Sequence, residues 1–127
     1  KTSDRIAKII PDSYSDSAKG LPGNDDSGAM SSWLAFNFVG LYPNAGFDYY
    51  IIHTPVVKTA TITANGKNKF VIEAKNLSEK NRYIVSAKLN GKDYPYSTIR
   101  HKDILAGGKL ELRMGPKPSS WGKKMWE

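Results

Sequence analysis

The chain of 127 residues contains no cysteine, and this absence excludes disulfide bridges, cysteine-ligated zinc sites and cysteine nucleophiles together. Long apolar runs are absent as well. The longest uncharged apolar stretch, around residues 30–42, is interrupted by three polar residues and a glycine. It is too short and too mixed to span a bilayer, so we expect no membrane span.

Basic residues are the most conspicuous excess, with 19 Lys and Arg against 12 Asp and Glu and a net charge of +7. Residues 1–47 carry four basic and five acidic side chains, whereas residues 48–127 carry 15 basic and seven acidic ones. A charge step of this kind predicts two structural units, 1–47 and 48–127. Because the chain starts at Lys1 without a leader pattern, we expect a piece of a longer polypeptide.

The first unit has helical patterning. Ile6, Ile9 and Ile10 lie at helical spacing, and Pro11 is predicted to end that helix. Residues 13–28 are rich in Ser, Gly, Pro and Asp and predict a loop. A second helix is predicted over 30–39. Its apolar residues cover nearly the whole circumference, so we expect it to come from the core of something larger.

From residue 57 onward, apolar residues alternate with polar ones, as in half-buried strands. Asn-Gly pairs at 65–66 and 90–91 predict two hairpins. The segments predicted as strands are 57–64, 69–74, 82–89, 92–97 and 109–114, with a helical turn at 101–105. The fold class predicted is α+β and mainly β, with a short helical portion followed by a small antiparallel β-sandwich.

The segment Gly20-Leu-Pro-Gly-Asn-Asp-Asp-Ser-Gly28 places Asp25 and Asp26 directly before the apolar helix. A carboxylate beside a helix N-terminus is favoured in its ionised form. Such a group can deprotonate a water or bind a hard cation such as calcium. A plain helix cap with a solvated turn is the alternative, and spacing alone favours it.

Other polar residues give weaker signals. His53 ends a strand-like run and suits an acid or a ligand, but a hydrogen-bonded residue at a strand end is favoured because no second His or Cys is near. His101 is expected at the surface or in a helix cap. The lysines fall mostly at turns and on the polar phase of strands, which indicates solvated faces rather than a nucleic-acid site.

A resemblance to a known family covers nearly the whole chain. The run Gly23-Asn-Asp-Asp-Ser-Gly-Ala-Met-Ser-Ser-Trp33, followed by Gly40-Leu-Tyr-Pro43, resembles glycoside hydrolase family 92, the calcium-dependent exo-acting α-mannosidases. The likeness continues at 50–55, 65–66, 81–84, 89–91, 101–108 and 121–122. It implies that residues 1–47 are a remnant of an α/α-toroid catalytic domain and that residues 48–127 are the β-rich C-terminal part.

The resemblance also implies site residues. Asp25 and Asp26 fall where the family has its catalytic base, and calcium is expected beside them with the same two residues as its candidate ligands. Asn24 and Trp33 are implied on the substrate side. The family's general acid is an upstream glutamate, and no glutamate of this chain matches that motif. The fragment is therefore expected to be inactive alone.

The parent enzyme implied by the resemblance cleaves terminal α-linked mannose, with α-1,2 linkages expected, by inverting, calcium-assisted hydrolysis. Its partners would be mannose-containing glycans and the upstream catalytic domain, and its location secreted or periplasmic. The alternative is a standalone β-sandwich that binds carbohydrate, with Trp121, Trp126 and tyrosines as stacking platforms. An electrostatic nucleic-acid binder is a third, weaker hypothesis.

Overall fold

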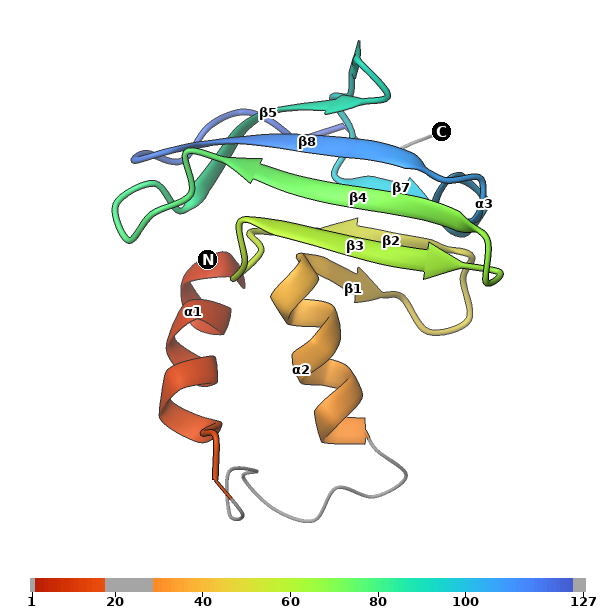
Figure 1. Cartoon of the computed structure of the whole chain (residues 1–127). Helices are drawn as coiled ribbons and strands as arrows, with labels where there is room; N and C mark the ends of the chain where they lie inside the picture. The colour runs from red at the N-terminus through yellow and green to blue at the C-terminus, as the bar shows by residue number, and fades with distance from the viewer. Residues whose placement is uncertain (1, 18–28, 125–127) are drawn as a thin grey trace.

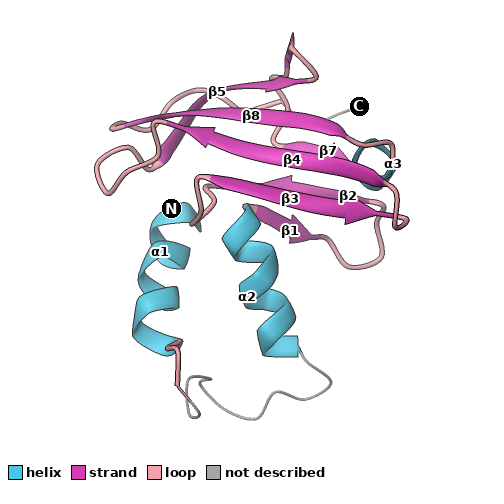
Figure 2. Cartoon of the chain, in the orientation of Figure 1, coloured by secondary structure: helices cyan, strands magenta, loops and turns pink. Residues whose placement is uncertain are grey.

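The computed structural model describes residues 2–17 and 29–124. The elements in chain order are α1 (Thr2–Ser13), α2 (Ala29–Val39), β1 (Leu41–Pro43), β2 (Tyr49–Ile52), β3 (Thr59–Ala64), β4 (Asn68–Lys75), β5 (Tyr83–Leu89), β6 (Lys92–Asp93), β7 (Thr98–Arg100), α3 (His101–Leu105) and β8 (Gly108–Gly115). Figure 1 and Figure 2 show α1 and α2 side by side on one side of the strands. Among the described helices, none has the length and apolar character that crossing a membrane requires.

The strands form two sheets that share one core. One sheet has the order β1-β2-β7 and the other the order β3-β4-β8-β5-β6. Leu41 and Ile99 of the first sheet are buried in the same cluster as Phe70, Ile72 and Leu110 of the second. This packing of two inner faces confirms the predicted fold class, a mainly β chain with a sandwich-like part and a few short helices.

The prediction of an antiparallel sandwich is wrong for one central pair of strands. β4 and β8 run parallel, with Phe70 opposite Gly108 and Lys75 opposite Arg113. The chain returns through β7 and α3 to the start of β4, where Asn68 Nδ2 donates to the Leu105 carbonyl at 2.9 Å. Alternation along a strand predicts which face is buried but not the direction of its neighbour, which the connection decides.

Both predicted hairpins are present. β3 pairs with β4 and β5 pairs with β6, antiparallel in each case. Asn65 and Gly66 have φ values of 53° and 66°, and Asn90 and Gly91 have values of 51° and 82°. Positive φ at both central residues is what a type I′ turn requires, and Asn-Gly adopts it at low cost.

Helix α1 is longer than predicted. Pro11 lies inside the helix, which continues to Ser13, and the Tyr14 amide donates to the Ile10 carbonyl at 3.0 Å. The prediction that Pro11 ends this helix is therefore wrong. A proline removes one helical donor, but the residues after it keep theirs, so a final turn can still form.

Helix α2 confirms the helix predicted over 30–39; it ends at Val39 and is followed by Gly40, whose φ is +79°. The described residues do not enclose it. Leu34 and Phe38 are half-buried and Ala35 is exposed, whereas Asn37 is fully buried. The division of the chain after residue 47 falls in the turn between β1 and β2, and it stays a prediction.

Candidate functional site

The predicted catalytic and calcium residues Asp25 and Asp26, and the predicted substrate residue Asn24, lie outside the described residues. The structure does describe the two helices that flank this segment. The ring of Tyr14, which follows α1, stacks on the ring of Trp33 in α2, with centroids 5.6 Å apart and planes 12° from parallel. This aromatic contact joins the two flanking helices.

Trp33, the other predicted substrate residue, is half-buried on α2. Beyond its contact with Tyr14, it lines a cavity of about 310 Å³ with residues of α1, β1 and β2. The residues of this cavity are Ile6, Trp33, Asn37, Tyr42, Ile51 and His53. The role of Trp33 in binding substrate stays a prediction.

His53 lies at the end of β2, as expected for a hydrogen-bonded residue at a strand end, and only 5% of it is exposed. Its Nδ1 lies 3.0 Å from the Thr54 carbonyl, and its backbone amide donates to the Gly40 carbonyl at 2.9 Å. Burial lowers the pKa of the imidazole below its ordinary value of 6.5, opposed by the carbonyls of Thr54 and Leu41. Burial therefore favours the neutral form of the ring.

Sequence reasoning did not single out Asn37, which is buried to 0% exposure beside His53 in the same cavity. Its Nδ2 donates to the Trp33 carbonyl at 2.7 Å. Among the described side chains, Asn37 Oδ1 and His53 Nε2 are buried without a hydrogen-bond partner, and so is Thr98 Oγ1. The sequence signal that could have identified Asn37 is its position as the one polar residue among the apolar residues 33–39 of the predicted helix.

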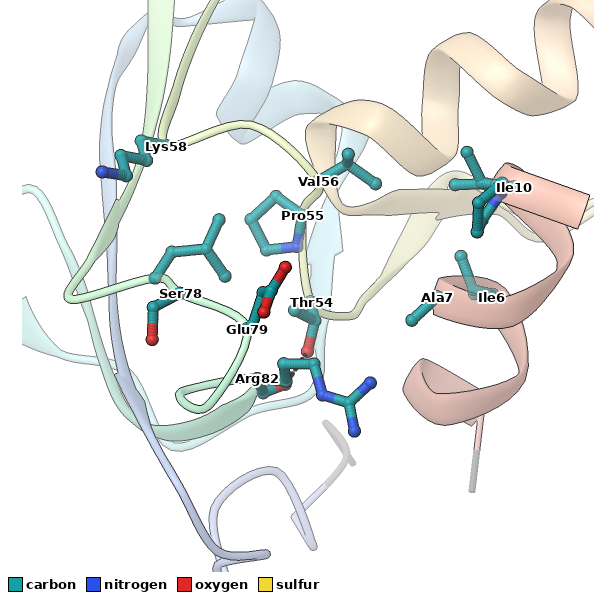
Figure 3. Close-up of a pocket in the computed structure, with 12 residues that line it drawn as sticks. Ile6, Ala7, Ile10, Thr54, Pro55, Val56, Lys58, Ser78, Glu79 and Arg82 are labelled. Carbon is teal, nitrogen blue, oxygen red and sulfur yellow. Dashed lines mark hydrogen bonds between the residues drawn. The ribbon is translucent and has the colours of Figure 1, made fainter. Parts of the chain in front are cut away.

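A second, larger hollow of about 480 Å³ lies between α1 and the β-rich part. Figure 3 shows Ile6, Ala7 and Ile10 of α1 on one side, and residues of the 54–58 and 77–82 segments on the other. Thr54 Oγ1 donates to the Arg82 carbonyl at 2.5 Å across its wall. Apolar side chains form most of this lining, and polar residues such as Lys58, Glu79 and Arg82 complete it.

The remaining candidates have local structural partners. His101 is exposed, and its Nδ1 lies 2.9 Å from the Tyr50 hydroxyl. Trp121 packs against the core and donates its indole N–H to the Tyr94 carbonyl at 2.8 Å. Trp126 lies outside the described residues. These contacts use Trp121 for packing within the chain, which argues against the hypothesis that its ring stacks on carbohydrate.

The excess of basic residues does not form an uninterrupted surface on the five-stranded sheet. Lys109 Nζ lies 2.6 Å from Glu73 Oε2 and 3.2 Å from Glu111 Oε1, and Lys75 Nζ lies 3.6 Å from Glu111 Oε2. The hydrogen bonds that the Lys109 ammonium donates to Glu73 and Glu111 raise its pKa. Paired charges of this kind favour a solvated sheet face over a phosphate-binding one.

Comparisons with known proteins agree along the chain. A sequence model of the glycosyl hydrolase family 92 catalytic domain matches residues 1–116. An uncharacterized secreted glycosidase of Arthroderma benhamiae is 43% identical over 122 residues, which cover 93% of this chain and 16% of that protein.

Solved structures give the same result. The family GH92 α-mannosidase BT3965 of Bacteroides thetaiotaomicron, in complex with mannoimidazole, superposes with a TM-score of 0.84 at 35% identity, over 91% of this chain and 15% of that one. The family GH92 inverting mannosidase BT2199 of the same species superposes with a TM-score of 0.81 at 30% identity, over 92% of this chain and 16% of that one. The chain thus spans only about a sixth of the length of these relatives.

Proposed function

This chain belongs to glycosyl hydrolase family 92, and on that premise we propose that it is the C-terminal part of an enzyme that removes terminal α-linked mannose from glycans. One observation carries the proposal. The match to the family's catalytic domain extends over residues 1–116, and it includes the segment that bears Asp25 and Asp26. We expect α-1,2 linkages as substrates and inversion at the anomeric carbon.

In this proposal Asp25 or Asp26 is the general base. Its carboxylate takes a proton from the water that attacks the anomeric carbon, while an upstream glutamic acid protonates the leaving oxygen. An inverting enzyme holds the two carboxyl groups roughly 6.5–9.5 Å apart with the water between them. The segment immediately precedes α2, and a helix N-terminus favours the ionised carboxylate that a base requires.

Calcium fits the chemistry of this segment. Asp25, Asp26 and Asn24 offer carboxylate and amide oxygens, the donors that calcium prefers. Calcium takes six to eight oxygen ligands, so the longer enzyme and the substrate would have to supply the rest. Among the described residues, no three His, Asp or Glu side chains gather into a metal site. When bound, the ion would orient sugar hydroxyls and offset negative charge.

We further propose that the parent enzyme is secreted or periplasmic and that it acts on mannose-containing glycans outside the cytoplasm. The fungal relative, 43% identical over 122 residues, is named as a secreted glycosidase. The absence of cysteine is compatible with either compartment. The isolated chain would be inactive, because the upstream glutamate that serves as general acid is not part of it.

The test places this chain in a chimera. Residues 1–116 replace the aligned segment of BT3965, and the chimera is assayed on α-1,2-mannobiose with calcium. We expect Asp→Asn at the base position to lower kcat by about 10²–10⁴-fold. Replacement of the other aspartate should raise the calcium concentration that half-maximal activity requires.

The matched control for the chimera is Asp16→Asn. Asp16 is an exposed carboxylate in the stretch that follows α1. This variant should retain full activity. Full activity of the double variant Asp25→Asn/Asp26→Asn, in a chimera that still binds mannoimidazole, would contradict the proposed role.

A further inference from the structure

The five-stranded sheet ends in β3, an edge strand that pairs, among the described strands, with β4 alone (Figure 1). The Ala74 amide donates to the Lys58 carbonyl at 2.7 Å just before β3, and this bond fixes which residues face β4. Along an antiparallel pair, residues that bond to the neighbouring strand alternate with residues that do not. Counting from Lys58, the backbone N–H and C=O groups of Thr59, Thr61 and Thr63 therefore point away from the sheet.

These outward groups have no backbone partner within residues 2–17 and 29–124. The side chains of Thr59, Thr61 and Thr63 are exposed, whereas Ala60 and Ile62 are half-buried on the other face of the strand. Ile62 packs against the core. The edge therefore offers a row of accessible donors and acceptors between a polar face and an apolar one, which is a template for an additional strand.

The other edges of the two described sheets differ from β3 in length and composition. β6 has two residues, both charged, and β1 and β7 have three residues each, with Pro43 at the end of β1. Short length, charge and proline are the means by which proteins prevent edge strands from pairing. β3 has six residues, four of them β-branched, and carries neither a charge nor a proline. Among the described edges it is therefore the one suited to pairing.

The sequence of β3 is complementary to itself. Two copies related by a two-fold axis at Thr61 would run antiparallel, with Thr61 opposite its own copy and Thr59 opposite Thr63. These are the residues whose N–H and C=O groups point outward, so each pair could exchange two backbone hydrogen bonds. Threonine would face threonine on the exposed side, and Ala60 would meet Ile62 of the second copy on the apolar side.

We propose that two copies of this chain associate through β3, antiparallel and centred on Thr61, so that their five-stranded sheets join into one. A second copy is favoured over an unrelated strand because one symmetric register satisfies the outward groups of both chains. Each copy has a single edge of this kind in its described part, so the contact is closed and association stops at a dimer. The inference does not rest on the proposed function, and it uses neither candidate catalytic aspartate.

The experiment is analytical ultracentrifugation of this chain over a range of concentrations. Because the net charge of +7 opposes association, the solution contains about 0.15 M salt, which limits the reach of exposed charges to about 8 Å. An interface of two edge strands is small, so we expect a monomer–dimer equilibrium with a dissociation constant between about 1 μM and 1 mM.

The variants Thr61→Lys and Thr61→Glu test the register. Each should raise the dissociation constant on the order of tenfold, because two like charges would lie directly opposite each other across the axis. An equimolar mixture of the two variants should recover the association, since a lysine then faces a glutamate. The matched controls are Ser86→Lys and Ser86→Glu, at an exposed residue of the inner strand β5, and they should associate like the unmodified chain.

A second measurement needs no variant. Amide hydrogen exchange of the unmodified chain, followed by NMR at low and high concentration, reports on each backbone N–H of β3. Exchange at Thr59, Thr61 and Thr63 should slow as the concentration rises and these amides find partners. Exchange at Ala60 and Ile62 should change little, because their amides already bond to β4.

Several results would overturn the inference. They are a chain that stays monomeric up to about 1 mM, assemblies larger than a dimer, and exchange at Thr61 that does not depend on concentration. A mixture of Thr61→Lys with Thr61→Glu that associates no more tightly than either variant alone would equally contradict it. A dimer that the mixture restores, with slowed exchange at every second residue of β3, is the result that the inference predicts.

Discussion

His53 combines three features at the scale of a single residue: deep burial, one fixed hydrogen bond and one unpaired nitrogen. The sequence predicted a hydrogen-bonded histidine at a strand end, and this is confirmed. Its neighbour Asn37 could not be predicted in the same way. Asn37 comes from a different element, and the meeting of α2 with β2 is a matter of tertiary packing.

The lowered pKa of His53 makes the stability of the fold depend on pH. Burial holds the pKa of this imidazole below 6.5 in the folded chain, so the unfolded chain takes up the proton first as pH falls. The free energy of unfolding should therefore decline as pH drops below about 6.5, and this contribution should level off once the pH is below the folded pKa.

Urea unfolding at a series of values from about pH 8 to pH 5 checks this dependence. His53→Asn should flatten the decline, and His101→Asn should leave it unchanged. Tyr42 is the other titratable residue lining the same cavity, and Asp4 lines an adjacent hollow with His53. An equal decline in the chain and in His53→Asn would contradict the assignment to His53.

At the scale of elements, the junction between α2 and β1 depends on Gly40. Its φ is +79°, and a Cβ at this position would lie 2.7 Å from the His53 carbonyl oxygen and about 3.0 Å from the Pro55 nitrogen. The chain therefore needs glycine here for two reasons, the left-handed conformation and the close approach of the segment after β2.

Gly40→Ala should destabilise the fold more than Gly46→Ala, which is the matched control. Gly46 has φ +83° with nothing within 4 Å of the point where a Cβ would lie, so its replacement should cost only the conformational strain, about 1–2 kcal/mol. The close approach at Gly40 should add on the order of 1–3 kcal/mol, as overpacking does. Chemical denaturation of both variants measures the difference, and equal losses would contradict this view of the junction.

The elements themselves were largely predictable from the sequence. The turns at Asn65-Gly66 and Asn90-Gly91 and the helix over 30–39 have local signals in turn chemistry and periodicity. Two features have no such local signal in the sequence. They are the parallel pairing of β4 with β8 and the last turn of α1 beyond Pro11. The parallel pair depends on where α3 returns the chain, and Pro11 shows that local breaking signals are weaker near a helix end.

At the scale of the whole molecule, the chain resembles a part more than an independent unit. Its positive charge lies in residues 48–127, which carry +8 of a total of +7, and there lysines on the sheet pair with Glu73 and Glu111. The apolar hollows and half-covered aromatic side chains lie instead around α1 and α2. The candidate catalytic segment could be predicted only through the family resemblance, because two aspartates before a helix are also an ordinary cap.

We propose that this chain supplies the base-bearing segment of an α-mannosidase and cannot act without the upstream portion. The most direct measurement compares initial rates of aryl α-mannoside hydrolysis, in calcium, for three samples: this chain, BT3965 without its aligned segment, and their mixture. We predict turnover in the mixture and none in either component. Clear turnover by the 127 residues alone would contradict the claim.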